Sequence, residues 1–525
     1  MKSKTLKNEY LILLVYTILT KFFVSINSIR FSEVFTDPDQ AIFYSIGRAV
    51  LNGKVLYKDV FDHKTPYIYF ANAIAALFDK NHLGLFIIEI ILMFVTLIYV
   101  YKFSHIYFSK TKSLVAALFI GVVLNINYIT FGYSRTESYA IAFMMPALYL
   151  FSKYFDCETS VAKEFNAKGM FAIGVLAGLT LMTNIRATIL FVPLAIMLML
   201  KLIKEKKYRE IALCFIFGLL GVIVSIIPYL IYMLVTNSVN DAIYAIFTTN
   251  ANYAISTVDT GTDVFSTAMF IISENVFFYI LLLISFISII ILKFNKYFKI
   301  SVLLSLTIAF TYVTFSNRTY VYYLVILMPY FLAIYYLIVN FVGARTTRPY
   351  GKGARTTCQY DNKRSSETRM HDINLVTVVV LAAVCLIFSI AINSGINNRY
   401  INHSRRAEKI KVAAKNFFGD KKDLKVLGFG FLPEVYVYMN KIPDYKFFMI
   451  PNVSYGIDST AFEEQYNYLL SRDPDLVVYR EYNLNYGVPT NMNNQIHYIL
   501  STSYELLDTI KTNEYEGIFY IFAKK

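Results

Sequence analysis

The sequence lacks tryptophan, and it has only four cysteines and few charged residues for its length. Charged residues make up 16% of the 525 residues, whereas about a quarter of a soluble globular chain is charged. The cysteines show no metal-ligand spacing, and the topology derived below leaves none of them in an outer loop. The composition therefore argues against a soluble protein, a cysteine-based zinc site and a disulfide framework.

Apolar residues dominate the chain. They make up 56% of it, and the mean hydropathy is +0.48. Repeated apolar runs of about twenty residues match the length that a helix needs to cross a bilayer. We predict an α-helical polytopic membrane protein with about eleven transmembrane helices. The predicted spans are 10–27, 83–101, 113–131, 138–152, 169–183, 187–200, 210–235, 266–292, 300–315, 320–341 and 373–393.

The net charge of +14 follows the membrane topology. The N-terminal MKSKTLKN is basic, and most of the other lysines and arginines near the spans fall in loops on that same side. The positive-inside rule then places the N-terminus in the cytoplasm and the first long loop outside. Because this pattern accounts for the basic character, we expect the lipid bilayer to be a partner and nucleic acid not to be one.

Three segments interrupt the pattern of spans. Residues 28–82 form the first outer loop, in which 66–79 are predicted to be an interfacial or re-entrant helix. Residues 343–372 repeat GARTT and are polar and basic, which predicts a disordered cytoplasmic linker. After the membrane domain (1–393), short apolar runs alternate with a helical pattern over 394–525. This predicts a small extracytoplasmic α/β domain beside the first outer loop.

Charged and polar side chains gather on the outer side, at the ends of separate spans. Such groups are costly near lipid and usually face a cavity or each other, so we expect them to form one site. These residues are Asp37, Asp39, Asp62, His63, Lys64, Arg135, Glu137, Asn184, Arg186 and Arg318.

Asp39 precedes QAIFYSIGRAVL, in which apolar residues recur at near-helical spacing. This pattern predicts an amphipathic helix that lies in the membrane interface. The helix N-terminus favours a carboxylate electrostatically. On spacing alone, Asp39 is explained equally well as the cap of this helix and as a residue with a chemical role.

The order of short motifs resembles a known superfamily. PDQ, GKVLYKD and DHKTP follow one another in the first outer loop, and GYSRTE, GLTLMT and SNRTYVYYLVILMPY continue the series over roughly residues 10–341. The ordered set resembles the GT-C superfamily of membrane glycosyltransferases. It is most similar to glycosyltransferase family 39, which contains protein O-mannosyltransferases and lipid A aminoarabinose transferases.

The resemblance implies a transferase of the cytoplasmic membrane. Its substrates would be a polyprenyl-phosphate-linked sugar donor and an extracytoplasmic acceptor, which could be a cell-surface glycan, a lipid or a protein. Asp39 matches the position of the family's catalytic base. The family's acidic partner is replaced here by Gln40, and Asp37 is the candidate substitute. Glu137 matches a later acidic position.

The resemblance also implies a set of substrate-binding residues. The family's acidic-Lys-Pro element resembles Asp62-His63-Lys64-Thr65-Pro66 with one residue inserted, so Lys64 would face the lipid phosphate. Asn184 stands at a basic position of the family, for which Arg186 could substitute. Arg318 matches a basic position before the tenth span. A single displacement with these residues would invert the anomeric centre.

Two questions stay open at this level. Oxygen-rich ligation by Asp39, Asp62, His63 and Glu137 could hold a divalent metal ion, although nothing in the spacing demands one. The alternative function is that of a membrane transporter or lipid flippase, and a third is that of a scaffold presenting residues 394–525. Transporters often show internal repeats and polar sites at mid-membrane, whereas here no repeat is seen and the polar residues lie on one face.

Overall fold

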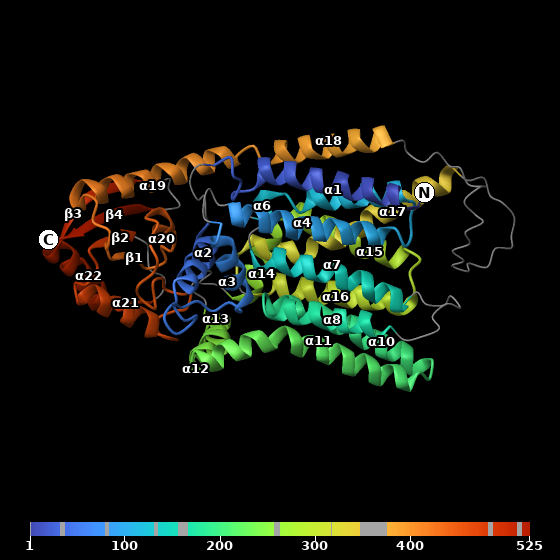
Figure 1. Cartoon of the computed structure of the whole chain (residues 1–525), viewed down its shortest axis with the longest axis horizontal. Coiled ribbons are helices and arrows are strands. Elements are labelled where there is room, and N and C mark those ends of the chain that lie inside the picture. The colour runs from blue at the N-terminus through green and yellow to red at the C-terminus, as the bar shows by residue number, and fades with distance from the viewer. Residues whose placement is uncertain are drawn as a thin grey trace.

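The computed structural model is a bundle of long helices with a small β-sheet domain at one end (Figure 1). We call that end of the bundle the sheet-domain end. The structure describes residues 2–31, 37–78, 83–130, 135–155, 166–256, 263–316, 318–346, 375–480, 487–511 and 517–525. Most of the predicted linker, residues 347–372, lies outside the described residues, as do Cys157 and Cys358. Cys214 and Cys385 are free thiols.

Every predicted span contains a helix of the bundle. By length and composition, five helices of the described chain can cross a membrane, or up to seven if each of two bent pairs counts as one span. The number of spans therefore stays a prediction. The helices are α1 (Lys2–Val24), α4 (Leu83–Ser104), α5 (Lys110–Val123), α6 (Asn127–Thr130), α7 (Thr136–Phe155), α8 (Ala167–Leu181), α9 (Ile185–Thr188), α10 (Phe191–Lys204), α11 (Tyr208–Val235), α14 (Val264–Glu274), α15 (Val276–Ile291), α16 (Lys296–Thr314), α17 (Leu332–Thr346) and α18 (Leu375–Ile392).

The predicted span 266–292 is not one straight helix. It is divided into α14 and α15, whose axes differ by 92°. Asn275 lies at the break with φ −125° and ψ 33°, outside the helical region. Both its backbone N–H, at 3.1 Å, and its side-chain amide, at 3.0 Å, donate to the carbonyl of Ile271, so the side chain adds a local hydrogen bond at the end of α14.

Small residues bring α8 and α11 into close contact. A Cβ at Gly174 would lie 2.0 Å from the carbonyl oxygen of Gly218, and one at Gly221 would lie 2.3 Å from that of Phe171. Neither position has room for a side chain. Such contacts are typical of membrane helices, where backbones approach through glycine and packing, rather than hydrophobic transfer, holds helices together.

The first outer loop folds into two short helices at the sheet-domain end (Figure 1), α2 (Pro38–Leu51) and α3 (Tyr67–Ala76). The helix expected within 66–79 is therefore present. α2 is buried on most of its faces between α3 and the sheet domain, and its position in the membrane interface stays a prediction. At the crossing of α2 and α3, a Cβ on Gly47 would come within 2.6 Å of the backbone of Ala73.

The C-terminal region forms one mixed sheet with helices around it. The strands are β1 (Val426–Phe429), β2 (Leu476–Arg480), β3 (Tyr504–Lys511) and β4 (Ile518–Lys524), in the order β1-β2-β4-β3. β1 and β2 are parallel, and β4 is antiparallel to both β2 and β3. The helices are α19 (Ile396–Phe418), α20 (Glu434–Tyr438), α21 (Thr460–Leu470) and α22 (Thr490–Ser503). The alternation of short apolar runs with helical patterns thus produced the expected α/β arrangement.

Candidate active site

Two adjoining cavities lie where the helical bundle meets the sheet domain. Their volumes are about 370 Å³ and about 40 Å³. The larger one is bounded by α2, the loop before α3, the start of the 3-10 helix η3 (Val321–Phe331) and the sheet domain, and the smaller one by α2, α7 and α9. The residues that line both are Asp39, His63, Lys64, Arg135 and Tyr322.

Asp37 and Asp39 begin α2 and share one arginine. Asp37 caps the helix by accepting from the backbone N–H of Gln40 at 3.0 Å, and Pro38 takes the first helical position, where its missing N–H is not needed. Asp37 lies 3.2 Å from a guanidinium nitrogen of Arg135, and Asp39 pairs with the other terminal nitrogen. The sequence left open whether Asp39 was the cap. The cap is Asp37, so the Asp39 carboxylate is directed elsewhere.

The two carboxylates differ in their access to the cavity. The side chain of Asp39 is 22% exposed and that of Asp37 only 7%. Burial raises the pKa of Asp37, Arg135 opposes this, and the neighbouring Asp39 adds to the rise. Asp39 is therefore the member of the pair that a ligand in the cavity can reach.

Gln40, which stands where the family has an acidic residue, turns away from the cavities. It is fully buried, and its side-chain amide donates to Asn72 on α3 at 2.9 Å. The second carboxylate beside Asp39 is thus supplied by Asp37, as the sequence analysis suggested. Its role in chemistry stays a proposal.

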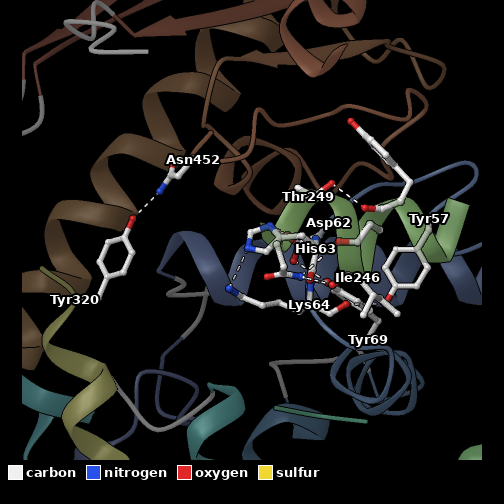
Figure 2. Close-up of polar contacts among 12 residues, drawn as sticks. Tyr57, Asp62, His63, Lys64, Tyr69, Ile246, Thr249, Tyr320 and Asn452 are labelled. Atoms are coloured by element: carbon white, nitrogen blue, oxygen red, sulfur yellow. Dashed lines mark hydrogen bonds and ion pairs between the residues drawn. The ribbon is translucent and has the colours of Figure 1, made fainter. Parts of the chain in front are cut away.

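Asp62, His63 and Lys64 form a chain of polar contacts (Figure 2). Asp62 accepts from the hydroxyl of Tyr69 at 2.7 Å, and its carboxylate lies 3.2 Å from Nδ1 of His63. Nε2 of His63 lies 3.3 Å from Nζ of Lys64. Asn250 donates to the carbonyl of His63 at 2.6 Å. These contacts hold the loop on both sides. The side chain of Lys64 therefore extends into the cavities from an anchored backbone.

Burial and the neighbouring Lys64 lower the pKa of His63, although Asp62 opposes this. Burial alone would raise the pKa of Asp62, but His63, Lys64 and Tyr69 hold it below its ordinary value. These directions favour a carboxylate at Asp62 and a neutral imidazole at His63 at neutral pH. Nε2 of a neutral His63 can then accept a hydrogen bond from Nζ of Lys64.

A pH dependence of stability follows from the lowered pKa of His63. Because the folded protein disfavours the imidazolium, the contribution of His63 is fully present above about pH 6.5 and is lost as the pH falls toward the folded pKa. We expect the unfolding temperature of the wild type to drop over that range more than that of His63→Gln. Thermal unfolding of both proteins between pH 7.5 and pH 5 measures the difference, and parallel curves would contradict it.

Glu137 lies in the first turn of α7 and lines the smaller cavity. It is almost fully buried, and one of its oxygens accepts from the side-chain amide of Asn184 at 3.1 Å. Asn184 also caps α9 by accepting from the N–H of Ala187 at 3.1 Å. Asn184 therefore links the carboxylate of Glu137 on α7 to the start of α9. A basic residue at this position would contact Glu137 as an ion pair.

Arg186 and Arg318 are held by tyrosines. The guanidinium of Arg186 lies 5.1 to 5.9 Å from the rings of Tyr253, Tyr312 and Tyr323, and Arg186 lines the smaller cavity. Arg318 is 1% exposed, lies 3.7 Å from the ring of Tyr253 and donates to its carbonyl. Arg318 lines neither cavity and instead supports Tyr253, which lines the larger one.

Tyr322 and Tyr323 come from an unusual helix. The predicted span 320–341 begins as the 3-10 helix η3 (Val321–Phe331), with Pro329 inside it, and continues as α17. Runs of 3-10 helix this long are uncommon and often mark functional positions. Tyr322 packs under Arg135, whose guanidinium lies 3.8 Å from the ring. The tighter helix therefore completes the support of the carboxylate pair.

Four residues that line the larger cavity were missed or given no role from the sequence. Arg135 was recognised as an outer residue, but its pairing spans 96 residues of chain and no local pattern marks it. Tyr322 lies within SNRTYVYYLVILMPY, but no pattern in the sequence gives this tyrosine a role. Asn452 and Arg480 line the larger cavity from the sheet domain, in which the sequence shows no motif.

The residues suggested as metal ligands line the two cavities but do not form one ligand set. Among the described residues, no group of three or more His, Cys, Asp or Glu side chains is placed to hold a metal ion. Asp39 is engaged by Arg135, and Asp62 by Tyr69 and His63. A divalent ion at this site stays a prediction.

A separate cavity of about 100 Å³ lies inside the bundle, between α7, α10 and α16. Its lining is almost wholly apolar and includes no ionisable acid or base apart from tyrosines. The ionisable residues singled out from the sequence line the polar pair of cavities instead, so that pair is the candidate active site.

The fold matches solved membrane glycosyltransferases. ArnT from Cupriavidus metallidurans bound to undecaprenyl phosphate is 12% identical with a TM-score of 0.59, and the match covers 98% of each chain. Its apo state is 10% identical with a TM-score of 0.57, covering 98% of this chain and 97% of that chain. The Archaeoglobus fulgidus oligosaccharyltransferase tethered with an acceptor peptide is 12% identical with a TM-score of 0.50, covering 97% of this chain and 74% of that chain.

The chain is a multi-pass membrane protein with the GT-C fold. A family model described as dolichyl-phosphate-mannose-protein mannosyltransferase matches residues 62–232. The fold and the family model together confirm the resemblance to the GT-C superfamily and the fold class predicted from the sequence. No curated protein sequence matches the chain.

Proposed function

We propose that this protein transfers a sugar from a polyprenyl-phosphate donor to an acceptor on the outer side of the cytoplasmic membrane. One observation carries the proposal: a carboxylate that is open to ligand, Asp39, lies in the same adjoining cavities as the cations Lys64 and Arg186. The similarity to ArnT bound to undecaprenyl phosphate supports the choice of donor.

The proposed reaction is a single inverting displacement. The hydroxyl oxygen of the acceptor attacks the anomeric carbon and gives its proton to the Asp39 carboxylate. The bond between that carbon and the phosphate oxygen breaks, and the leaving polyprenyl phosphate takes the electron pair. Lys64 and Arg186 would face this growing negative charge, and removal of one such contact typically costs about 3 kcal/mol of barrier. Glu137 holds Asn184 beside Arg186 on this side of the cavity.

The proposed orientation puts the N-terminus in the cytoplasm and the sheet domain outside. It is supported by the basic loops on the N-terminal side and by the position of the sheet domain beside the first outer loop (Figure 1). We expect an epitope tag after Lys525 to be accessible in intact cells or spheroplasts, and a tag before Met1 to be accessible only after permeabilisation. Labelling both tags with an impermeant reagent measures this, and the reverse pattern would refute the orientation.

A deletion strain tests the function. We expect it to accumulate a lipid-linked sugar and to lose a sugar from a surface glycan, lipid or protein, as seen by mass spectrometry of lipid extracts and surface material. Wild-type protein should restore both, and Lys64→Gln should not, because the phosphate loses its ammonium contact. Lys58→Gln is the matched control, since Lys58 is exposed in the same loop and lines neither cavity. Substrate uptake into vesicles without a covalent product would instead favour a transporter.

A further inference from the structure

Tyr253 lies where several cations of the site meet. It belongs to α13 (Thr249–Ile255), is 3% exposed and lines the larger cavity. Nζ of Lys64 lies 6.0 Å from the centre of its ring, and Cζ of Arg186 lies 5.9 Å from it. Cζ of Arg318 lies closer, at 3.7 Å, and this arginine also donates to the carbonyl of Tyr253. One aromatic ring therefore borders three basic side chains.

Cations that are gathered in a small buried space repel one another. The repulsion is larger there than at a surface, because less water screens it. The face of an aromatic ring carries negative charge and attracts cations within about 6 Å of its centre. The ring of Tyr253 thus stabilises the grouping of Lys64 and Arg186, whose charges oppose each other, and it does so before any anion has entered the cavities.

α13 also contacts the loop that carries Lys64. The rings of Tyr253 and His63 have their centres 5.2 Å apart and their planes 30° apart. Asn250, three residues before Tyr253 and so on the same side of the helix, donates to the carbonyl of His63 at 2.6 Å. One short helix therefore holds the backbone next to Lys64 and places an aromatic ring beside its side chain.

The sheet domain fixes the segment that carries Tyr253. The π-helix η2 (Tyr244–Thr248) runs directly into α13, and such helices are rare and frequently occur at functional sites. The hydroxyl of Tyr244 and the side-chain amide of Asn252 donate to the same carboxylate oxygen of Asp458, at 2.8 Å and 3.3 Å. Asn252 directly precedes Tyr253. The position of the ring is therefore set from the sheet domain as well as from the membrane domain.

We propose that Tyr253 is a positioning residue, whose ring gathers Lys64 and Arg186 into one binding site for the phosphate of the lipid donor. The inference rests on the proposed function, in which these two cations face the leaving phosphate. Tyr253 takes no part in bond making and acts through the cations. A role in packing alone would depend on the shape of the side chain, whereas attraction depends on the electron density of the ring face.

The test measures the affinity of the full chain, in lipid nanodiscs, for undecaprenyl phosphate. We expect Tyr253→Leu to weaken binding about tenfold or more, because the ring face is lost. Tyr253→Phe keeps the ring and should bind nearly as the wild type does. Trifluorophenylalanine at position 253 keeps almost the shape of phenylalanine, but its fluorines withdraw electron density from the ring face. It should therefore bind more weakly than Tyr253→Phe, and this comparison decides the matter even if Tyr253→Leu does not fold.

Tyr229→Leu is the matched control for the loss of a buried ring. Tyr229 is also 3% exposed, packs against Phe70 and Tyr232, and lines neither cavity. Its replacement removes the same volume from the outer part of the bundle without changing the surroundings of the cations. Affinity for undecaprenyl phosphate should therefore stay close to that of the wild type.

A double-mutant cycle with Arg186→Gln tests whether the ring acts through the cation. Tyr253→Leu should weaken binding much less in the Arg186→Gln background than in the wild type. Equal weakening in both backgrounds would overturn the inference. Wild-type affinity of Tyr253→Leu, or equal affinity of the fluorinated variant and Tyr253→Phe, would overturn it too, and in each case the proposed function would stand. If the wild type itself does not bind undecaprenyl phosphate, the proposed function fails and this inference fails with it.

Discussion

Replacing Asp39 with Asn is expected to reduce sugar transfer from a polyprenyl-phosphate donor by about 10²- to 10⁴-fold, the usual contribution of a general base. The amide has almost the size of the carboxylate and keeps an oxygen that can accept from Arg135. It cannot take a proton from the acceptor hydroxyl. Transfer should therefore fall while affinity for undecaprenyl phosphate stays close to that of the wild type. Initial rates with the accumulated donor from the deletion strain, together with binding of the lipid phosphate, measure both.

Asp59→Asn is the matched control for this experiment. Asp59 lies in the same loop, accepts from the N–H of Val55 at 2.7 Å and lines neither cavity. An asparagine preserves that acceptor, so folding and transfer should be unaffected. If Asp39→Asn transferred sugar at the wild-type rate, Asp39 would not be the base, and Asp37 and Glu137 would be examined next.

Much of the site could be predicted because membrane topology sorts polar residues by side. Asp39, His63, Lys64, Glu137 and Arg186 are far apart in the sequence, yet all line the two cavities. Lysines and arginines indicate which side each loop faces, and ionisable groups at helix ends avoid lipid by meeting one another. No knowledge of helix packing was needed to expect that these residues converge.

Other features depend on packing that no short pattern records. Pro38 at the first helical position did indicate that the cap is the residue before it, so Asp37 could have been recognised. The break between α14 and α15 lies at a single non-helical residue, Asn275, within an otherwise apolar run. Arg480 reaches the cavity only because the parallel pair β1 and β2 directs its carboxyl ends toward the membrane domain. Such placements follow from the tertiary fold.

The second large effect is expected from Arg135→Gln. The side chain of Arg135 is 8% exposed and forms ion pairs with both Asp37 and Asp39. The ring of Tyr322 packs against its guanidinium. Removing one member of a buried ionic group leaves the others uncompensated and typically costs about 3–5 kcal/mol of stability. We expect a marked fall in the unfolding temperature in nanodiscs and a loss of transfer, because Asp39 also loses the contact that positions it.

The dependence of this destabilisation on pH and on Asp37 separates an electrostatic cause from a packing cause. Burial already raises the pKa of Asp37, and Arg135 opposes that rise, so Arg135→Gln raises the pKa further. A carboxyl whose folded pKa is raised contributes stability at low pH that is lost as the pH rises through the folded pKa. The deficit of Arg135→Gln should therefore be larger at pH 8 than at pH 5. Adding Asp37→Asn to Arg135→Gln should recover part of the stability and reduce this pH dependence. If the deficit were equal at both pH values and unchanged by Asp37→Asn, Arg135 would act through packing on Tyr322, and the shared arginine would not be what holds the carboxylate pair together.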